Sequence, residues 1–363
     1  MKAFVTGGSG FLGRSVVQKL CTQGHEVIAL TRSADSAAKL ITLGATPLLG
    51  DITNRESMRD AMSGADVVFH LAAWHEMDNK HWRTAELTNV SGTRNVLSLA
   101  HEVGVPRIIY TSTIEIFGDT QGAIADETYY TEQPLTNHYE RTKWQAHYQV
   151  ALPLIKKGAP ITIVMPGLIY GPDDPSVLGD LMYRFFYDLP PFPLLPGPHT
   201  KFAYTHVDDV ADGHLQAWEK GQIGESYILA GSAVSLGEMV EFWARLLGKR
   251  PPLIHLTRSF LQPVSPLLSQ MAHLFDLPPI LTAEATEIMG ATHSVIANKA
   301  KQELGWNPQP LQVGMLDTFK HIEEKMPPPL PSRPPEQTVA IMALVTAAAL
   351  VTFWALGRLF RRK

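Results

Sequence analysis

Short runs of apolar and β-branched residues alternate along the first half of the chain with stretches whose apolar positions recur at helical spacing. Runs such as Val67-Val68-Phe69 lack a polar face, which is typical of strands buried on both sides of a parallel sheet. Strands joined by helices of ten or more residues predict right-handed crossovers and a doubly wound α/β fold. The predicted strands cover residues 2–6, 26–30, 46–49, 66–71, 107–112 and 161–165.

A glycine-rich turn follows the first predicted strand and opens the first predicted helix. Its glycines have a GxxGxxG spacing, with Phe11 and Leu12 between the second and the third. Glycine lets the backbone approach a pyrophosphate, and the first N–H groups of the helix then hold that anion. We therefore expect Gly7, Gly10, Phe11, Leu12 and Gly13 to bind a dinucleotide cofactor.

The end of the chain departs from the pattern of a soluble enzyme. Residues 326–337 are a proline-rich linker, expected to adopt an extended polyproline II conformation. Residues 338–357 carry no charge, and as a helix they are long enough to span a bilayer core of about 30 Å. A basic tail, 358–363, follows. These features predict a single-pass C-terminal transmembrane helix that anchors the protein in a membrane.

The orientation of this anchor is predicted from the other end of the chain. Because the first residues already form a strand of the nucleotide-binding fold, no signal peptide is expected and the catalytic domain should lie in the cytoplasm. The basic tail favours the opposite orientation under the positive-inside rule. The need for a cytosolic cofactor supports the cytoplasmic placement.

Composition agrees with a folded enzyme. The 363 residues are 45% hydrophobic and 18% charged, enough for a large core and a second domain. A net charge of −4 provides no basic field for nucleic acid. The single cysteine, Cys21, excludes a disulfide framework, and the 14 histidines show no HExxH or CxxC pairing, so we expect no metal site.

Tyr139 and Lys143 are the candidate catalytic pair. They lie at positions i and i+4 of a helix predicted to begin near Asn137, so both side chains share one helix face. A tyrosine with a pKa of about 10 is a poor base at neutral pH, but a nearby ammonium and an oxidised nicotinamide favour the phenolate. Tyr139 is then able to exchange a proton with a substrate alcohol or carbonyl.

The glycine turn, the strand-end hydroxyls Ser112-Thr113 and the Tyr139-x-x-x-Lys143 pair occur in an order that resembles the extended short-chain dehydrogenase/reductase family. This family is also known as the NAD-dependent epimerase/dehydratase type. The resemblance extends from the first residue to about residue 325 and is strongest to the branch of 3β-hydroxysteroid dehydrogenases and dihydroflavonol reductases. Further matching segments are 70–73, 89–95, 110–113, 166–172 and 206–211.

The resemblance implies a Rossmann-like doubly wound parallel sheet with a smaller C-terminal substrate domain. We place the nucleotide-binding domain in residues 1–171, with returns of the chain near 203–230. Residues 172–325 form mainly the substrate domain, because the proline-rich segment 188–198 continues neither a helix nor a central strand. A helix-mediated homodimer is common among such proteins and is one expected assembly.

The resemblance also assigns the catalytic roles. Tyr139 exchanges the proton, Lys143 additionally bonds the nicotinamide ribose, and Thr113 orients the substrate oxygen. Thr113 is preferred to Ser112 because the family hydroxyl stands five positions before a glycine, here Gly118. Sugar-nucleotide dehydratases have two acids directly after this hydroxyl, whereas this chain has Ile114 and then Glu115, so dehydration is disfavoured. Glu115 itself is read equally well as a site residue or as a solvated or ion-paired one.

The choice of cofactor depends on the end of the second predicted strand. NAD-specific relatives have an acid there that binds the ribose 2′-hydroxyl, whereas Arg32 offers a guanidinium for a 2′-phosphate. We predict NADP(H), with NAD(H) as the alternative. The resemblance assigns further cofactor contacts to Asp51, Ile52, Leu71, Ala72, Ala73, Pro166 and Gly167.

Three functions are compatible with these residues. The leading hypothesis is a membrane-tethered oxidoreductase that interconverts a hydroxyl and a ketone on a small apolar molecule such as a sterol, triterpenoid or lipid. The second is a nucleotide-sugar epimerase or reductase. It is disfavoured by the few cations of residues 178–201, which are Arg184 and Lys201. The third is a noncatalytic NADP-binding scaffold, which is disfavoured by the complete Thr113, Tyr139 and Lys143 set.

Overall fold

The computed structural model of the chain describes residues 1–75, 82–132, 135, 137–189, 192–263, 265, 286 and 289–328. The chain divides into two compact units. The first comprises Met1–Gly171, Phe202–Ala233 and Thr292–Gly314. The second comprises Pro172–Lys201, Val234–Ala291 and Met315–Lys363, as far as these residues are described. Residues 292–314, which the sequence-based division assigns to the substrate domain, thus group with the first unit.

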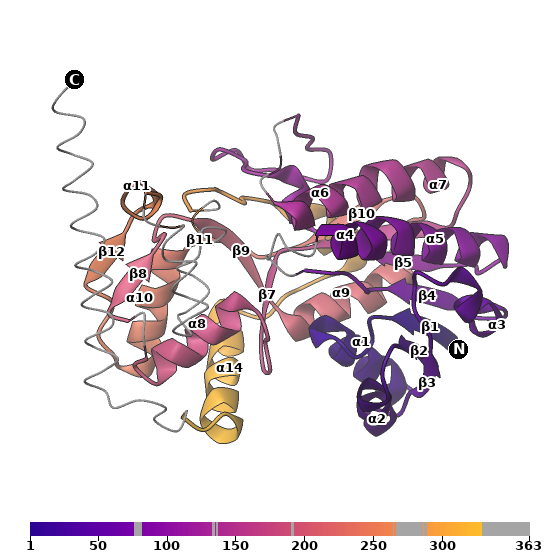
Figure 1. The fold of residues 1–363 in the computed structure, drawn as a ribbon, viewed down its shortest axis with the longest axis horizontal. Helices are drawn as coiled ribbons and strands as arrows, with labels where there is room; N and C mark the ends of the chain where they lie inside the picture. Colours follow the sequence, from indigo (N-terminus) through magenta and orange to yellow (C-terminus); the bar gives the residue numbers. More distant parts are fainter. Residues whose placement is uncertain are drawn as a thin grey trace. The chain divides into compact units, whose positions relative to one another are not determined.

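The first unit is built on a seven-stranded sheet in which all neighbouring strands are parallel (Figure 1). The strand order is β10-β6-β5-β4-β1-β2-β3. From β1 the chain adds β2 and β3 on one side and then β4 and the later strands on the other side, so the strand order reverses between β1 and β4. Doubly wound sheets bind their ligands at such a point. The predicted Rossmann-like α/β fold is therefore confirmed. The strands are β1 (Lys2–Thr6), β2 (Glu26–Thr31), β3 (Thr46–Leu49), β4 (Val67–His70), β5 (Ile108–Thr111), β6 (Ile161–Pro166) and β10 (Ser226–Leu229).

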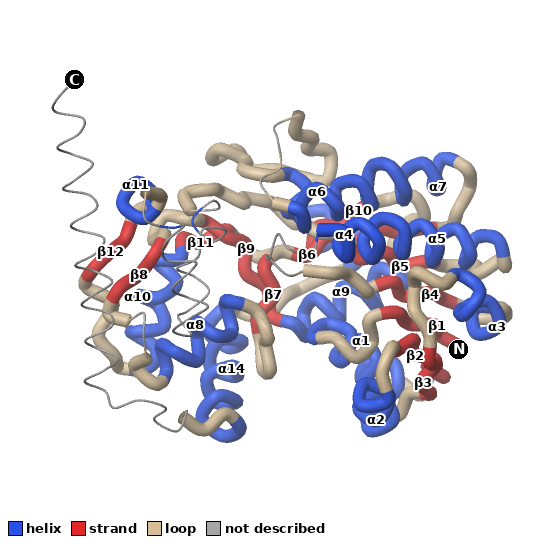
Figure 2. The backbone as a smooth tube through the Cα atoms, in the orientation of Figure 1, coloured by secondary structure: helices blue, strands red, loops and turns tan. Residues whose placement is uncertain are grey.

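Helices cover both faces of this sheet, with α1, α2 and α9 on one face and α4 to α7 on the other (Figure 1). Figure 2 shows the same arrangement as red strands between two layers of blue helices. The helices are α1 (Phe11–Thr22), α2 (Ala34–Thr42), α3 (Arg59–Met62), α4 (Trp82–Ala85), α5 (Thr93–Glu102), α6 (His138–Gln145), α7 (Leu152–Lys156) and α9 (Val207–Lys220). Shorter helical segments are η1 (Arg55–Met58), η3 (Glu86–Gly92), η4 (Ile114–Phe117), η5 (Ala146–Ala151) and η7 (Ala300–Leu304).

The central strands β4 and β6 are buried along their whole length because helices cover both of their faces. All four residues of β4 are at most 1% exposed, and all six residues of β6 are buried. Beside this sheet, β7 (Leu168–Tyr170) runs parallel to β9 (Lys201–His206), with Leu168 opposite Tyr204. The short strand β11 (Ala233–Ser235) comes later in the chain.

The second unit has its own apolar core. The ring of Trp243 packs against Phe185 at 5.8 Å and against Phe319 at 5.9 Å between ring centroids. A capping box between Ser235 and Glu238 begins the helix that carries Trp243. The elements are α8 (Val177–Phe186), α10 (Leu236–Leu247), α11 (Arg258–Leu261) and α14 (Leu311–Lys325), with the paired strands β8 (Leu194–Pro196) and β12 (Ile254–Leu256).

Among the described residues, no helix has both the length and the apolar character needed to cross a bilayer. The transmembrane helix predicted at 338–357 and the basic tail 358–363 lie outside the described residues. So do residues 329–337 of the predicted linker. The membrane anchor therefore stays a prediction.

Candidate active site

The carboxyl ends of the parallel strands bring most of the predicted site residues to one edge of the sheet. Each of these residues lies at the last position of a strand or within a few residues after it. Ligands of doubly wound sheets bind along this edge. The residues are Gly7 after β1, Arg32 after β2, Asp51 and Ile52 after β3, Leu71 to Ala73 after β4, Thr113 after β5, and Pro166 and Gly167 at the end of β6.

The glycine turn has the close backbone packing that a pyrophosphate site needs. Gly7 has a φ of 74°, and a Cβ there would lie 2.6 Å from the backbone nitrogen of Ala72. A Cβ on Gly13 would overlap the carbonyl of Gly7. Gly10 precedes α1 and gives no side-chain cap, so Phe11 and Leu12 present backbone N–H groups at the helix start. The turn therefore fits the phosphates of a dinucleotide.

A hydrogen-bonded chain holds the end of β4 against this turn. The hydroxyl of Thr6 is 2.7 Å from Nδ1 of His70, and Nε2 of His70 is 2.9 Å from the hydroxyl of Thr93. The same Thr6 oxygen accepts from the backbone N–H of Ala72 at 3.4 Å. Burial, assisted by the charge of Lys143, lowers the pKa of His70 to about 3. The neutral ring thus fixes the backbone of Leu71 to Ala73 beside the glycines.

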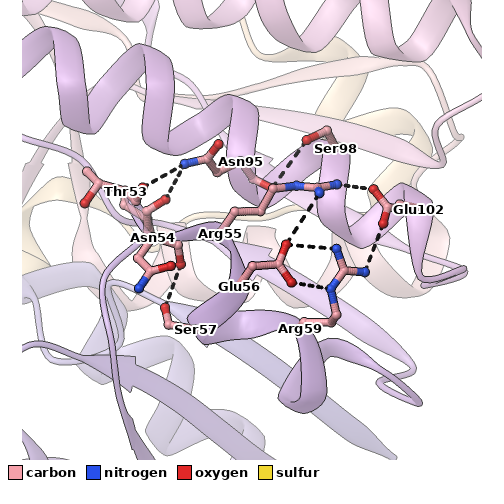
Figure 3. Close-up of polar contacts among 10 residues, drawn as sticks. Thr53, Asn54, Arg55, Glu56, Ser57, Arg59, Asn95, Ser98 and Glu102 are labelled. Carbon is pink, nitrogen blue, oxygen red and sulfur yellow. Dashed lines mark hydrogen bonds and ion pairs between the residues drawn. The ribbon is translucent and has the colours of Figure 1, made fainter.

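The loop after β3 is fixed from α5. Asp51 accepts hydrogen bonds from the backbone N–H and the hydroxyl of Thr53, both at 2.8 Å. The amide of Asn95 donates to the carbonyl of Ile52 at 3.0 Å and to that of Thr53 at 3.2 Å (Figure 3). The Asp51-Ile52 segment, predicted to contact the adenine, is therefore held in one position.

An exposed charge cluster lies next to this loop (Figure 3). Arg59 pairs with Glu56 at 2.6 Å and with Glu102 at 2.9 Å, and Arg55 also pairs with Glu102. Hydrogen bonds from the two arginines lower the pKa of Glu102. Exposed pairs of this kind contribute little to stability, so we interpret the cluster as a tether between η1, α3 and α5.

Arg32 is exposed and directly follows β2. The neighbouring hydroxyl of Ser33 accepts a hydrogen bond from the N–H of Ser36 at 3.2 Å and so caps α2. The Ser33 hydroxyl is thus used as a helix cap, and the guanidinium of Arg32 stays the candidate for binding a 2′-phosphate. Gly167 packs on β9, because a Cβ there would overlap the carbonyl of Ala203.

The candidate catalytic residues meet between α6 and the end of β5. Asn137 starts α6 by accepting a hydrogen bond from the N–H of Glu140 at 2.8 Å, which sets the phase of the helix. Nζ of Lys143 donates to the carbonyl of Thr111 at 2.6 Å, and the residue is 3% exposed. The side chain of Thr113 lies close enough to the phenol of Tyr139 to oppose the rise in its pKa. The predicted proton donor Tyr139, the lysine Lys143 and the orienting hydroxyl of Thr113 therefore lie together.

Sequence reasoning missed a third contact of the same kind. His147 follows Lys143 by one helical turn, and its Nδ1 is 2.9 Å from the hydroxyl of Ser112. Tyr139, Lys143 and His147 thus form one stripe, at i, i+4 and i+8, that faces three consecutive residues at the end of β5, Thr111 to Thr113. Burial, with the charge of Lys143, lowers the pKa of His147 to about 3, so its ring is neutral. The four-residue spacing is the signal that identifies it.

Asn89 fixes α6 from the other side. Its amide nitrogen donates to the hydroxyl of Thr142 and to the carbonyl of Trp74, both at 2.9 Å. Its amide oxygen accepts from the N–H of Trp74 at 2.7 Å. Asn89 therefore joins the helix that carries Tyr139 to the segment after β4, and acts as a positioning residue.

Burial dominates the electrostatics of the site. It raises the pKa of Tyr139, an effect reinforced by Glu115 and Tyr110 and opposed by the side chain of Thr113. The sequence led us to expect that the ammonium of Lys143 favours the phenolate of Tyr139. The groups of the protein itself instead raise the pKa of Tyr139. Burial instead lowers the pKa of Lys143 to about 7, although Glu115 opposes this shift. The phenol is therefore protonated and the lysine titrates near neutral pH.

Glu115 belongs to this electrostatic group. Burial and the carboxylate of Glu140 raise its pKa to about 8, while Lys143 opposes the shift. Its N–H also donates to the hydroxyl of Thr113 at 3.2 Å. The sequence left open whether Glu115 is a site residue or a solvated one. Its interactions with Tyr139 and Lys143 place it within the site.

The family model described as NAD dependent epimerase/dehydratase family matches residues 3–230, more than half of the chain. The chain belongs to this family. It is an NAD(P)-dependent oxidoreductase of the extended short-chain dehydrogenase type. The close packing of the glycine turn and the buried Lys143 fit the dinucleotide that the family description implies: the turn would hold its phosphates, and Lys143 would bind its nicotinamide ribose.

Individual relatives align with most of the length of this chain. A putative dihydroflavonol 4-reductase of Synechocystis is 30% identical over 86% of this chain and 92% of its own. Sterol demethylase protein B of Methylococcus capsulatus is 28% identical over 90% of this chain and 99% of its own. The crystal structure of gox2253 is 32% identical, covers 89% of this chain and 98% of its own, and has a TM-score of 0.76.

Proposed function

We propose that this family member is a membrane-attached oxidoreductase that uses NADP(H) to interconvert a hydroxyl and a ketone on an apolar, sterol-, triterpenoid- or lipid-like molecule. The observation that carries the proposal is the convergence of Tyr139, Thr113 and Lys143 at the carboxyl end of β5. A proton donor, an orienting hydroxyl and a titratable lysine at the carboxyl edge of the sheet are the groups that carbonyl reduction requires.

The chain's own residues account for the proton chemistry. When bound, the nicotinamide supplies or accepts the hydride at the substrate carbon. Tyr139 supplies the proton to the substrate oxygen during reduction and removes it during oxidation. The Thr113 hydroxyl orients the same oxygen. Because burial keeps the phenol protonated, Tyr139 is ready to donate its proton during reduction.

Two observations support an apolar substrate. In the second unit Arg184 pairs with Asp180 at 2.7 Å, which neutralises a cation that a diphosphate would use. The Methylococcus relative is named a sterol demethylase protein, which agrees with this substrate class.

The function is tested in cells that produce either the wild type or Tyr139→Phe. Lipids and nucleotide sugars are extracted and compared by mass spectrometry. The proposal predicts that the variant accumulates a sterol-like alcohol or ketone. Accumulation of a nucleotide sugar would support the epimerase or reductase alternative, and unchanged extracts with unchanged cellular activity would support a noncatalytic scaffold.

Arg32 is proposed to select NADP(H). The wild type is expected to use NADP(H) in preference to NAD(H), because an exposed guanidinium after β2 is positioned for a 2′-phosphate. Arg32→Asp should lower kcat/KM for NADP(H) by about ten- to a hundredfold, the usual value of a charge-assisted hydrogen bond. Initial rates with both cofactors measure this. Lys39→Asp, at an exposed position of α2, is the control and should leave the preference unchanged. A wild type that prefers NAD(H) contradicts the assignment.

Residues 338–357 are proposed to anchor the protein, with the catalytic domain in the cytoplasm. A chain that ends at residue 337 should move from the membrane fraction to the supernatant after lysis, because the uncharged segment is removed. Immunoblots of the two fractions measure this. Protease added to sealed microsomes should digest the catalytic domain of the full-length protein. A truncated chain that still sediments with membranes would show that another segment binds the bilayer.

A further inference from the structure

Three aromatic rings from two distant parts of the first unit form a cluster. Phe202 and Tyr204 lie two residues apart on β9, so they share one face of the strand, and their ring centroids are 6.1 Å apart. The imidazole of His293 stacks on Phe202 with a centroid distance of 5.9 Å and an interplanar angle of 4°. Phe202 is therefore the centre of the cluster, with a polar ring on either side.

Both polar rings are buried without a partner for one polar atom. Tyr204 is 4% exposed and His293 is 6% exposed. Within the described part of the chain, neither the hydroxyl of Tyr204 nor Nδ1 of His293 has a hydrogen-bond partner. A buried polar group without a partner is destabilising, and native proteins rarely keep one unless it has a role. Two such groups beside one ring indicate a binding position.

The cluster is attached to the chain segments that carry the catalytic residues. Tyr204 on β9 pairs with Leu168 on β7. Leu168 lies two residues after Pro166, which ends β6. On the other side, the N–H and hydroxyl of Thr292 donate to Asp119 at 2.9 and 3.0 Å. Asp119 directly follows Gly118, at the end of the short segment that begins with Thr113.

The chemistry of the two groups selects a neutral ligand atom. Burial raises the pKa of Tyr204, and burial lowers the pKa of His293 although Asp119 opposes that shift. Both side chains are therefore uncharged at neutral pH. A carboxylate or phosphate would require cations or several donors. A phenol and a neutral imidazole beside an aromatic face instead suit a hydroxyl or a carbonyl on an apolar skeleton.

We propose that Phe202, Tyr204 and His293 form a subsite that binds a second, unreactive hydroxyl or carbonyl of the substrate, away from the oxygen that reacts at Tyr139. This subsite rests on the proposed function, because it presupposes an apolar substrate. It selects apolar molecules with two oxygen functions over those with one.

Tyr204→Phe tests the subsite, because it removes a single oxygen atom. The probes are androstanol, which has one ring-A hydroxyl, and androstanediol, which adds a ring-D hydroxyl. Binding to the protein loaded with cofactor is followed by quenching of tryptophan fluorescence, and KM and kcat are measured in parallel. For the wild type we expect tighter binding of androstanediol. The variant should bind androstanediol about tenfold more weakly, and androstanol unchanged, since one hydrogen bond is lost.

Thermal unfolding separates this role from a structural one. Tyr204→Phe should unfold at the same or a higher temperature, because the hydroxyl has no partner within the described chain. Tyr227→Phe is the matched control. Its buried hydroxyl accepts from the N–H of Gln222 at 3.0 Å and donates to Glu303 at 2.8 Å. That variant should unfold at a lower temperature and keep the wild-type preference between the two steroids.

The outcomes distinguish the subsite from the function on which it rests. If androstanol is bound and oxidised but Tyr204→Phe leaves the preference for androstanediol unchanged, the subsite is refuted and the proposed function stands. A lower unfolding temperature with unchanged affinities also refutes the subsite and gives Tyr204 a structural role. If neither steroid binds to the wild type, the proposed steroid-like substrate and the subsite are refuted together.

Discussion

Replacing Tyr139 by phenylalanine is expected to lower kcat/KM by about 10²- to 10⁴-fold, the usual contribution of a positioned proton donor. The ring still packs between α6 and the end of β5, so the fold and the affinity for the cofactor should change little. The variant lacks the hydroxyl that donates a proton to the substrate oxygen when the hydride is transferred to the substrate carbon. Steady-state kinetics with a steroid ketone, together with a fluorescence titration of the cofactor, measure the two effects separately.

Tyr148→Phe is the matched control for this variant. Tyr148 lies on η5, shortly after Lys143 in the chain, and its hydroxyl donates to the carbonyl of Tyr129 at 3.5 Å. Removing that hydroxyl should leave kcat/KM close to the wild-type value. A Tyr139→Phe protein that reduces the ketone at the rate of the control would show that another group supplies the proton.

Lys143→Met is expected to lower kcat/KM by about a hundredfold or more and to weaken cofactor binding. The methionine keeps most of the buried chain but has neither the charge nor the N–H donors. It should also change how stability depends on pH. Burial lowers the pKa of Lys143 from 10.5 to about 7, so between these pH values the unfolded chain binds a proton that the folded chain has lost. The free energy of unfolding contributed by this group therefore rises with pH across that window.

In Lys143→Met the free energy of unfolding should no longer rise with pH. Urea denaturation at several pH values between 8 and 10 measures this free energy. The comparison is made in a Glu115→Gln background, because the contribution of Glu115 has the opposite sign and Lys143 opposes the rise of its pKa. The pKa of Glu115 is raised from 4.5 to about 8, so the folded chain keeps a proton that the unfolded chain loses, and stability falls as pH rises through that interval. Lys156→Met, at an exposed position of α7, should show the wild-type pH dependence. An equal slope in Lys143→Met and the wild type would mean that the lysine is not buried as described.

The fold is predictable from the sequence because its central strands are buried on both faces. A strand such as β4, with the apolar run Val67-Val68-Phe69 and four buried residues in succession, is recognisable from the sequence alone. The predicted bounds at 2–6 and 46–49 agree with those of β1 and β3, and those of β2, β4, β5 and β6 differ by one residue at one or both ends. Short strands such as β8 and β12, three residues each, were not predicted because so few residues give no readable alternation.

The site is predictable where its residues are close in sequence or follow a strand. The spacing of Tyr139 and Lys143 and the position of Thr113 after a buried strand follow from local pattern alone. The protonation states do not, because the pKa of a buried lysine depends on residues such as Glu115 that tertiary folding brings near. The cluster of Tyr204 and His293 joins segments far apart in the chain, so no local pattern identifies it.

The central claim is that Tyr139 and Lys143 act as one catalytic unit next to the nicotinamide. Its most direct test is a double-mutant cycle in single-turnover experiments, in which the nicotinamide absorbance is followed with a steroid ketone at saturating cofactor. If the two residues form one unit, Tyr139→Phe combined with Lys143→Met should be about as slow as the slower single variant. Independent, multiplying losses, or a Tyr139→Phe protein with the wild-type hydride-transfer rate, would contradict the account.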